Sequence, residues 1–163
     1  MPARNWGFWA FIAVLAVLHF LLHLGLGLGA TAPDLLTVAV LLAARRLSGA
    51  AAAGVGLVLG LVQDSLSLVA FGADAVALAV LGFLGTRSRD FFVGDSLLFV
   101  AVYLFLGKWL HDVLYFLLYS TLPSTAGVDL RRVLLVDAPT AAVYAAIAGT
   151  LALLGYRATT KER

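Results

Sequence analysis

Residues 33–72, PDLLTVAVLLAARRLSGAAAAGVGLVLGLVQDSLSLVAFG, decide the fold of this chain. They contain two short apolar runs joined by the paired arginines Arg45 and Arg46, and the second run ends on Gln63 and Asp64. Both runs are too apolar for surface helices of a soluble protein, which carry polar side chains on their outer faces. The stretch therefore predicts two helices of a membrane-embedded bundle, joined by a basic hairpin.

The whole chain has the composition of an integral membrane protein. Of its 163 residues, 63% are hydrophobic and 12% are charged, whereas soluble domains carry about 25% charged residues. With roughly 20 apolar residues to a spanning helix, the apolar runs suffice for five or six spans. The absence of cysteine excludes disulfides and thiolate metal sites. The small net charge of +2 argues against nucleic-acid binding.

We expect an all-α, polytopic transmembrane bundle of about six helices that forms a single integral membrane domain over residues 1–163. The apolar runs are continuous and lack the alternation of barrel strands, which indicates helices. Two of them are short and reach only about 20 Å, so they tilt little, thin the bilayer or sit inside the bundle. The first run is longer than the core of an export signal, which indicates a retained helix. The predicted spans are residues 6–28, 32–44, 48–69, 73–86, 93–118 and 132–154.

Loop charges predict the orientation. With the N-terminus in the cytoplasm, eight Lys or Arg residues collect on the cytoplasmic side, against Arg131 and Arg132 on the other. This bias follows the positive-inside rule and predicts that both termini are cytoplasmic. The same topology places most acids and all the histidines in the outer half, as expected around an outward-facing cavity or a partner site. The eight basic residues are Arg4, Arg45, Arg46, Arg87, Arg89, Arg157, Lys161 and Arg163; the outer acids are Asp34, Asp64, Asp74, Asp112, Asp129 and Asp137; the histidines are His19, His23 and His111.

Two of the predicted helices carry stripes of small residues at i, i+4 spacing. In lipid, such stripes let helix backbones approach closely. We interpret them first as packing sites within the bundle, with a homodimer or a partner helix as the alternative, and expect the other faces to contact membrane lipid. The stripes are Ala52, Gly56 and Gly60 in the third helix and Ala141, Ala145 and Gly149 in the last.

The fifth predicted helix is the most polar. Lys108, Asp112 and Tyr115 lie on one of its faces. Because a charge at membrane depth is costly, this face should turn into the bundle, with Lys108 and Asp112 paired. The pair either holds helices together or belongs to a pocket for a partner or ligand. The residues expected to form a polar core or partner site are Pro33, Asp34, Gln63, Asp64, Lys108, Asp112 and Tyr115.

Catalytic and metal-binding patterns are weak in this sequence. His19 and His23 have a spacing that can chelate a metal, and His111 lies at similar depth. Hydrogen bonds to a neighbouring helix or to water are the commoner role of such histidines, so no metal or other cofactor is expected. Neither a Gly-rich phosphate loop nor a serine motif with a plausible base is present. We therefore expect a non-enzymatic protein.

The order of these features resembles the MreD family, the rod shape-determining membrane proteins of bacteria. The resemblance rests on Pro33 and Asp34 before a short apolar helix, the arginine loop, the Gly-rich helix GVGLVLGLVQD, the run to Gly72, and Asp112 within HDVLYFLLY. It implies a non-enzymatic, multi-pass subunit of the cell-elongation (Rod) complex in the bacterial inner (cytoplasmic) membrane, which helps to regulate or scaffold peptidoglycan synthesis and rod cell shape. The implied direct partner is MreC; RodA, its transpeptidase and MreB would be reached through the complex.

The MreD family is also similar in fold to the substrate-binding subunits of energy-coupling-factor transporters, so the resemblance implies that fold here. The alternative function is therefore that of a small-molecule (vitamin) binding subunit of such a transporter. That alternative predicts a docking motif of alanines at i, i+4 in the first helix. Here Ala10, Ala13 and Ala16 are three residues apart, which disfavours it.

Overall fold

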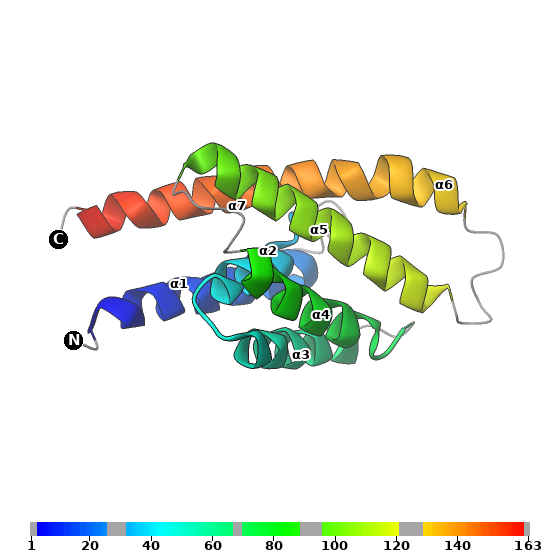
Figure 1. Ribbon diagram of the computed structural model, residues 1–163, viewed down its shortest axis with the longest axis horizontal. Helices are drawn as coiled ribbons and strands as arrows, with labels where there is room; N and C mark the ends of the chain where they lie inside the picture. Colours follow the sequence, from blue (N-terminus) through cyan, green and yellow to red (C-terminus); the bar gives the residue numbers. More distant parts are fainter. Residues whose placement is uncertain (1–2, 26–31, 67–69, 89–95, 121–128, 162–163) are drawn as a thin grey trace.

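The computed structural model describes residues 3–25, 32–66, 70–88, 96–120 and 129–161, and in these ranges the chain forms six helical segments and no strand (Figure 1). The prediction of an all-helical chain is confirmed. The ends of three predicted spans, at residues 26–28, 67–69 and 93–95, lie outside the described residues. The segments are α1 (Ala3–Phe20) continued by the π-helical η1 (Leu21–Gly25), α2 (Leu35–Ala44), α3 (Gly49–Ser65), α4 (Ala73–Arg87), α5 (Leu97–Tyr119), and α6 (Leu130–Arg132) continued by the π-helical η5 (Val133–Asp137) and by α7 (Ala138–Lys161).

Three of these segments are long and apolar enough to cross a membrane: Trp6–Leu24, Leu97–Tyr119 and Val133–Thr160. At 1.5 Å per residue they reach about 28, 34 and 42 Å, against a hydrocarbon core of about 30 Å. The helices α2 and α3 are also apolar but shorter, and reach only about 15 and 26 Å. The chain therefore has the helices of a membrane protein. The beginning of α1 and the end of α7 lie at the same end of the molecule (Figure 1).

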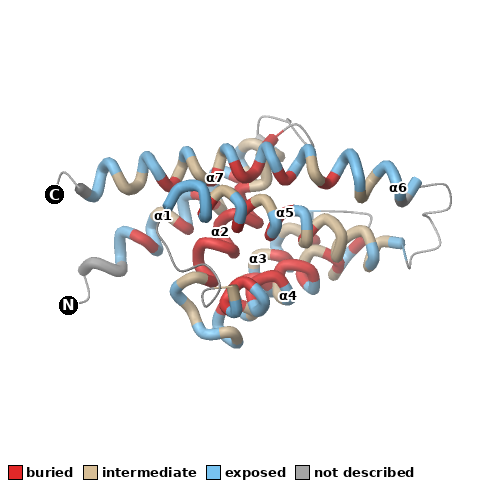
Figure 2. Tube along the Cα trace, turned by 45° about the horizontal axis from the view of Figure 1, so that its top comes forward, coloured by how far each residue is buried: buried red, intermediate tan, exposed pale blue. Residues whose placement is uncertain are grey.

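The short helix α2 lies at the centre of the bundle, and all of its residues are buried (Figure 2). It contacts α1, α3, α4, α5 and α7. Its sequence, LLTVAVLLAA, is apolar on every side except at Thr37, so each face can be covered by another helix. Asp34 is the N-cap, and its Oδ1 accepts a hydrogen bond from the N–H of Thr37 at 3.0 Å. Of the three placements expected for a short helix, α2 takes the one inside the bundle.

The helices α3 and α4 pack together along the predicted stripe of small residues (Figure 1). Ala52, Gly56 and Gly60 are the buried residues of the stripe on α3. A Cβ atom on Gly56 would overlap the backbone of Leu78, and one on Gly60 would overlap the backbone of Ala75. The two backbones are therefore in direct contact. Because α4 fills the stripe on α3, a partner helix cannot bind there.

The small residues of α7 divide between packing and a cavity. Ala145 is fully buried, and a Cβ atom on Gly149 would press against the side chains of Leu104 in α5 and Val38 in α2. Ala141 is exposed and lines a cavity between helices. Two residues of the stripe therefore bring α7 against α2 and α5, and the third belongs to the cavity wall.

The helix α5 is fixed to the central helix by a close approach and a hydrogen bond. Gly107 faces Leu41 of α2, with no room for a Cβ atom between them. One turn earlier, the hydroxyl of Tyr103 donates to the carbonyl oxygen of Leu41 at 2.9 Å. This bond satisfies the buried hydroxyl group of Tyr103 in an otherwise apolar interior. It also fixes the position of α5 along the axis of α2.

Candidate functional site

Lys108 lies at the centre of a buried charge network that joins α2 and α5. Its Nζ donates to Asp34 Oδ2 at 2.7 Å and to Asp112 Oδ1 at 2.6 Å. Asp34 is also held by Thr37, whose hydroxyl donates to Oδ2 at 2.6 Å. Lys108 is only 8% exposed, so two carboxylates replace the water that would otherwise solvate the ammonium group. The i, i+4 pairing of Lys108 and Asp112 expected from the sequence is therefore extended to a third charge on another helix.

His111 extends the network from α5 to α4. Its Nδ1 lies 3.2 Å from Asp112 Oδ1, and its Nε2 lies 3.3 Å from Asp74 Oδ1. Nε2 is buried and makes no hydrogen bond to a described residue. Tyr115, one turn further along α5, stacks on the imidazole with 6.4 Å between ring centroids. Three aspartates from three elements thus surround one lysine and one histidine, since Asp34 caps α2, Asp74 belongs to α4 and Asp112 to α5.

His19 connects α1 to the beginning of α2 and to the end of α3. The N–H of Leu36 donates to His19 Nδ1 at 3.3 Å, so Nδ1 is unprotonated. The proton is then on Nε2, which donates to Gln63 Oε1 at 3.2 Å. Asp34 Oδ1 lies 3.6 Å from Nδ1, beyond hydrogen-bond distance. The bonds of both nitrogens are those of a neutral imidazole.

The histidine pair of α1 and η1 is arranged for hydrogen bonding. His23 Nδ1 donates to the carbonyl oxygen of His19 at 3.0 Å, and the two rings stack with 4.0 Å between centroids. Both ring nitrogens of His19 are already engaged. Among the described residues, no group of three or more His, Cys, Asp or Glu side chains is placed to hold a metal ion.

Asp64, the last acid of α3, holds the beginning of α4. Its two carboxylate oxygens accept the N–H groups of Asp74 at 3.1 Å and Ala75 at 2.8 Å. These N–H groups belong to the first turn of α4 and have no partner within the helix. Gly72 precedes them with φ of 96°, in the left-handed region that glycine adopts most easily. Asp64 therefore acts apart from Asp112, as a cap supplied by the neighbouring helix.

Replacing Asp64 with leucine is expected to lower the free energy of unfolding by about 1–3 kcal/mol, because two buried N–H groups lose their acceptor. Asp64→Asn should cost less, since its carbonyl oxygen still accepts one of the two bonds. Unfolding of both variants by SDS titration in mixed micelles, followed by circular dichroism, measures the difference. A leucine variant as stable as the wild type would contradict the capping role.

A polar cavity of about 800 Å³ opens beside the network. It is surrounded by the end of α1, the beginnings of α2 and α4, the end of α3, and the facing parts of α5 and of η5–α7. Its size lies within the range of about 300–1,000 Å³ found for small-molecule pockets. Its polar lining includes His19, His23, Asp34, Gln63, Asp74, Lys108, His111, Asp112, Asp137 and Thr140, and its aromatic lining is Tyr115, Phe116, Tyr119 and Tyr144.

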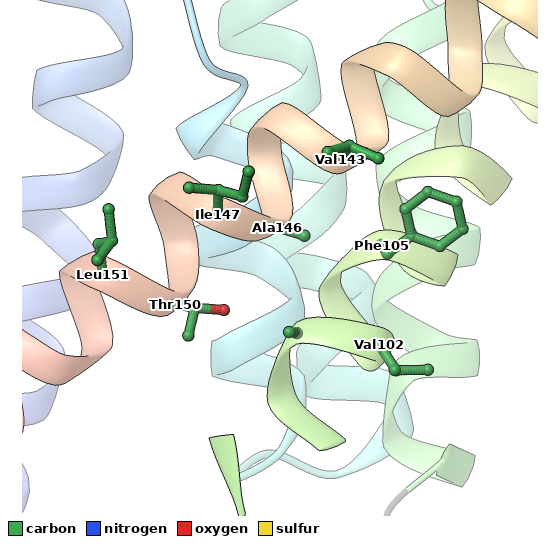
Figure 3. A pocket seen from close by; sticks show the side chains of 8 residues that line it. Val102, Phe105, Val143, Ala146, Ile147, Thr150 and Leu151 are labelled. Atoms are coloured by element: carbon green, nitrogen blue, oxygen red, sulfur yellow. The ribbon is translucent and has the colours of Figure 1, made fainter. Parts of the chain in front are cut away.

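An apolar groove of about 410 Å³ lies between α5 and α7 (Figure 3). Thr150 is its one polar lining residue, and the hydroxyl oxygen is buried without a hydrogen-bond partner among the described residues. The groove and the cavity follow one another along the same two helices, since Val143 lines the first and Tyr144 the second. The groove is lined by Ala101, Val102, Phe105, Val143, Ala146, Ile147, Thr150 and Leu151.

Most of the residues predicted as a polar core or partner site meet at the cavity. Asp34, Gln63, Lys108, Asp112 and Tyr115 line it. The two others lie beside it: Asp64 binds the backbone of α4, and Pro33 precedes the N-cap of α2, where its carbonyl oxygen accepts the N–H of Leu35 at 2.9 Å.

Four residues of the network are absent from the predicted set: His19, Thr37, Asp74 and His111. Three of them could have been included from the sequence, because the predicted topology places His19, Asp74 and His111 at the same outer depth as Asp34. Thr37 could not; its role follows from the capping geometry of Asp34.

No family model, curated protein or solved structure matches this chain.

Proposed function

We propose that the protein is a non-enzymatic subunit of the bacterial cell-elongation complex that binds MreC, as the resemblance to MreD implies, and helps to scaffold peptidoglycan synthesis at the inner membrane. The observation that supports this most directly is the order of the two surfaces on α5 and α7. An apolar groove is followed along the same helix pair by a polar cavity. A partner with one transmembrane helix and a polar continuation outside the membrane has matching surfaces in the same order.

The groove between α5 and α7 would receive the transmembrane helix of MreC. Small side chains at Ala101 and Ala146 leave the hollow between the two helices, and close approach at such positions is what drives helix association in lipid. Thr150 adds a hydroxyl group at the bottom of the groove that has no described partner. A backbone carbonyl or polar side chain of the partner helix would satisfy it. This groove takes the place of the small-residue stripe on α3, which α4 already fills.

Co-purification with MreC in detergent tests the proposal, and two valine variants sharpen it. Val143 lines the groove, and Val58 is an exposed residue of α3, on a different helix. Val143→Trp fills the groove and should reduce the recovered MreC by about tenfold, since overpacking costs about 1–3 kcal/mol. Val58→Trp makes the same chemical change and should leave the recovery of MreC unchanged.

The two valine variants also separate loss of binding from loss of folding, because each is checked for a monodisperse peak in size-exclusion chromatography. If wild-type protein and folded MreC fail to co-elute, the proposed partner is wrong. If Val143→Trp and Val58→Trp retain MreC equally, MreC binds at another surface than the groove.

The polar cavity also supports a second candidate, a small-molecule binding subunit of an energy-coupling-factor transporter. Its volume of about 800 Å³ and its mixture of charged and aromatic walls suit a ligand of vitamin size. That function predicts a stoichiometric ligand that survives purification. Mass spectrometry of the denatured protein would detect it, and a preparation free of such a ligand that still binds MreC would favour the first candidate.

A further inference from the structure

We infer that His111 carries both ring protons, and that this imidazolium joins the beginning of α4 to α5 through a contact that opens when a proton is lost. We call the contact of His111 with Asp74 the clasp. The inference goes beyond the proposed function, because it concerns how two helices are joined beside the polar cavity, whichever partner or ligand enters it. It rests on the partners of the two ring nitrogens, on the charges around them and on the packing of α4.

Both ring nitrogens of His111 face carboxylate oxygens. Nδ1 lies 3.2 Å from Asp112 Oδ1, and Nε2 lies 3.3 Å from Asp74 Oδ1. An ionised carboxylate only accepts, whereas a neutral imidazole has one N–H group and one lone pair. A neutral ring would therefore point its lone pair at one of the two carboxylates, but the imidazolium presents an N–H group to each. The side chains of His111 and Asp74 are only 7% and 13% exposed, so water screens their interaction little.

The surrounding charges favour the same protonation state. Lys108 and Asp112 lie on α5 with His111, Asp74 lies on α4, and Asp34 caps the beginning of α2. With a neutral His111, this group holds three carboxylates and one ammonium. Protonation of the ring reduces the excess from two negative charges to one. Because an uncompensated charge at low exposure is costly, the ring proton stabilises the network.

The other ionisable groups around the ring do not supply this positive charge. Tyr115 of α5 stacks on the imidazole, and Tyr144 of α7 lines the same cavity. His19 of α1 is neutral, as its hydrogen bonds require. Asp137 of η5 adds a further carboxylate at the rim, 3.9 Å from the exposed Arg132, which does not line the cavity. The second proton of His111 is therefore the charge that faces Asp74.

The clasp holds one end of α4 against α5, and a different contact holds the other end. Near the end of α4, the hydroxyl of Tyr103 donates to the carbonyl oxygen of Gly85 at 3.4 Å. At the beginning of α4, Nε2 of His111 faces Asp74 without forming a hydrogen bond, so the attraction there depends on the charge of the ring. The same end of α4 is fixed to α3 by Asp64 and by the close backbone contact of the two helices. Loss of the ring proton therefore releases the beginning of α4 from α5, and α4 moves together with α3.

The clasp also lies in the wall of the polar cavity. Asp74 lines the cavity from α4, and His111 lines it from α5. Separation of the two side chains therefore widens the cavity between these helices, and return of the proton narrows it. The protonation of one histidine in this way controls the width of the cavity.

Nuclear magnetic resonance of the full-length protein, labelled with ¹⁵N-histidine in detergent micelles, tests the charge state. The chain has three histidines, and the spectrum of His111→Phe identifies the signals of His111. At about pH 8 an ordinary histidine, with a pKa of about 6.5, is neutral. We expect two protonated ring nitrogens for His111 at this pH, and one protonated nitrogen for His19.

Two aspartate variants with the same chemical change show whether the proton depends on the clasp. Asp74→Asn removes the carboxylate that faces Nε2 and should leave His111 with one protonated nitrogen at about pH 8, because a nearby opposite charge favours the charged form. Asp137→Asn is the control, because Asp137 lines the same cavity but is exposed and lies beside Arg132. It should leave both nitrogens protonated. The inference is overturned if the wild-type ring has one protonated nitrogen at this pH, or if both variants give the wild-type signals.

Distances between pairs of spin labels test the movement of α4. The chain has no cysteine, so labels attach only to introduced ones. One pair replaces Val76, near the beginning of α4, and Leu117, near the end of α5. A second pair replaces Leu84 and Leu98, at the opposite ends of the same two helices. All four side chains are exposed, so the labels leave the core intact.

We expect His111→Phe to shift the first pair to longer distances and to leave the second pair unchanged. His23→Phe is the control, because His23 lines the same cavity but donates to a backbone carbonyl; it should change neither distance. Wild-type protein at a pH where the spectrum shows a neutral His111 should reproduce the shift, which keeps the test valid if His111→Phe does not fold. A first-pair distance that stays constant when the ring becomes neutral, or an equal shift of both pairs, would overturn the inference. Failure of MreC to co-elute would contradict the proposed function alone, because these measurements need no partner.

Discussion

Replacing Lys108 with methionine is expected to destabilise the protein by about 3–5 kcal/mol, the usual cost of removing one partner from a buried ion pair. The ammonium group bonds Asp34 and Asp112 at 2.7 and 2.6 Å. Without it, two half-buried carboxylates remain: Asp34 keeps Thr37 and the nearby His19, and Asp112 keeps His111. The free energy of unfolding, measured by SDS titration in mixed micelles, should fall by this amount, together with a lower yield of monodisperse protein.

A second variant shows whether the loss comes from uncompensated charge. In Lys108→Met/Asp34→Asn the carboxylate of Asp34 is gone and Asp112 keeps His111, so much of the stability should return. Arg132→Met is the control, because Arg132 is exposed, its distance to Asp137 is 3.9 Å, and surface pairs contribute about 0–1 kcal/mol. A double variant less stable than Lys108→Met would refute the charge explanation.

Gly56→Ala is expected to destabilise the protein by about 1–3 kcal/mol, although alanine normally favours a helix over glycine by about 1 kcal/mol. The added Cβ atom would overlap the backbone of Leu78, and a backbone cannot move aside as a flexible side chain can. Gly82→Ala should behave in the same way, because its Cβ atom would overlap the carbonyl of Ala52 across the same contact. Thermal unfolding monitored by circular dichroism measures both effects.

Gly54 provides the matched control for Gly56. It lies on the same helix, and a Cβ atom there would meet nothing within 4 Å. Gly54→Ala should therefore leave the stability unchanged or raise it by up to about 1 kcal/mol. If Gly54→Ala and Gly56→Ala unfold at the same temperature, the close backbone contact of α3 and α4 does not contribute to stability.

The sequence was sufficient to predict the helices but not their neighbours. Continuous apolar runs and the start at Asp34 indicated α2, and the Gly-rich pattern indicated α3. Both helices are apolar along most of their length, yet α2 is buried on every side and α3 on a single stripe. Hydropathy does not distinguish a lipid-facing side chain from a helix-facing one, because both surroundings are apolar. The central position of α2 could therefore not be read from its composition.

Only the contacts of the charge network that lie within one helix could be predicted from the sequence. Lys108 and Asp112 are four residues apart on α5, so helical geometry alone brings them together. The contacts of Lys108 with Asp34 and of His111 with Asp74 join residues far apart in the chain. They depend on how α5 crosses α2 and α4. The spacing of residues within one helix gives no information about that crossing. The common depth of these groups was foreseeable, and their pairing was not.

The enclosure of α2 on all sides also imposes an order on biosynthesis. The ribosome releases α2 well before α5 and α7, yet both of these helices cover it in the finished protein. Until they arrive, Leu41 lacks the hydroxyl of Tyr103, and Val38 lacks its contact with Gly149. A nascent chain that ends before α7 can already pair α3 with α4. The side of α2 that α7 covers in the finished protein is then still uncovered. The core of this protein is therefore completed only once α7 has been made.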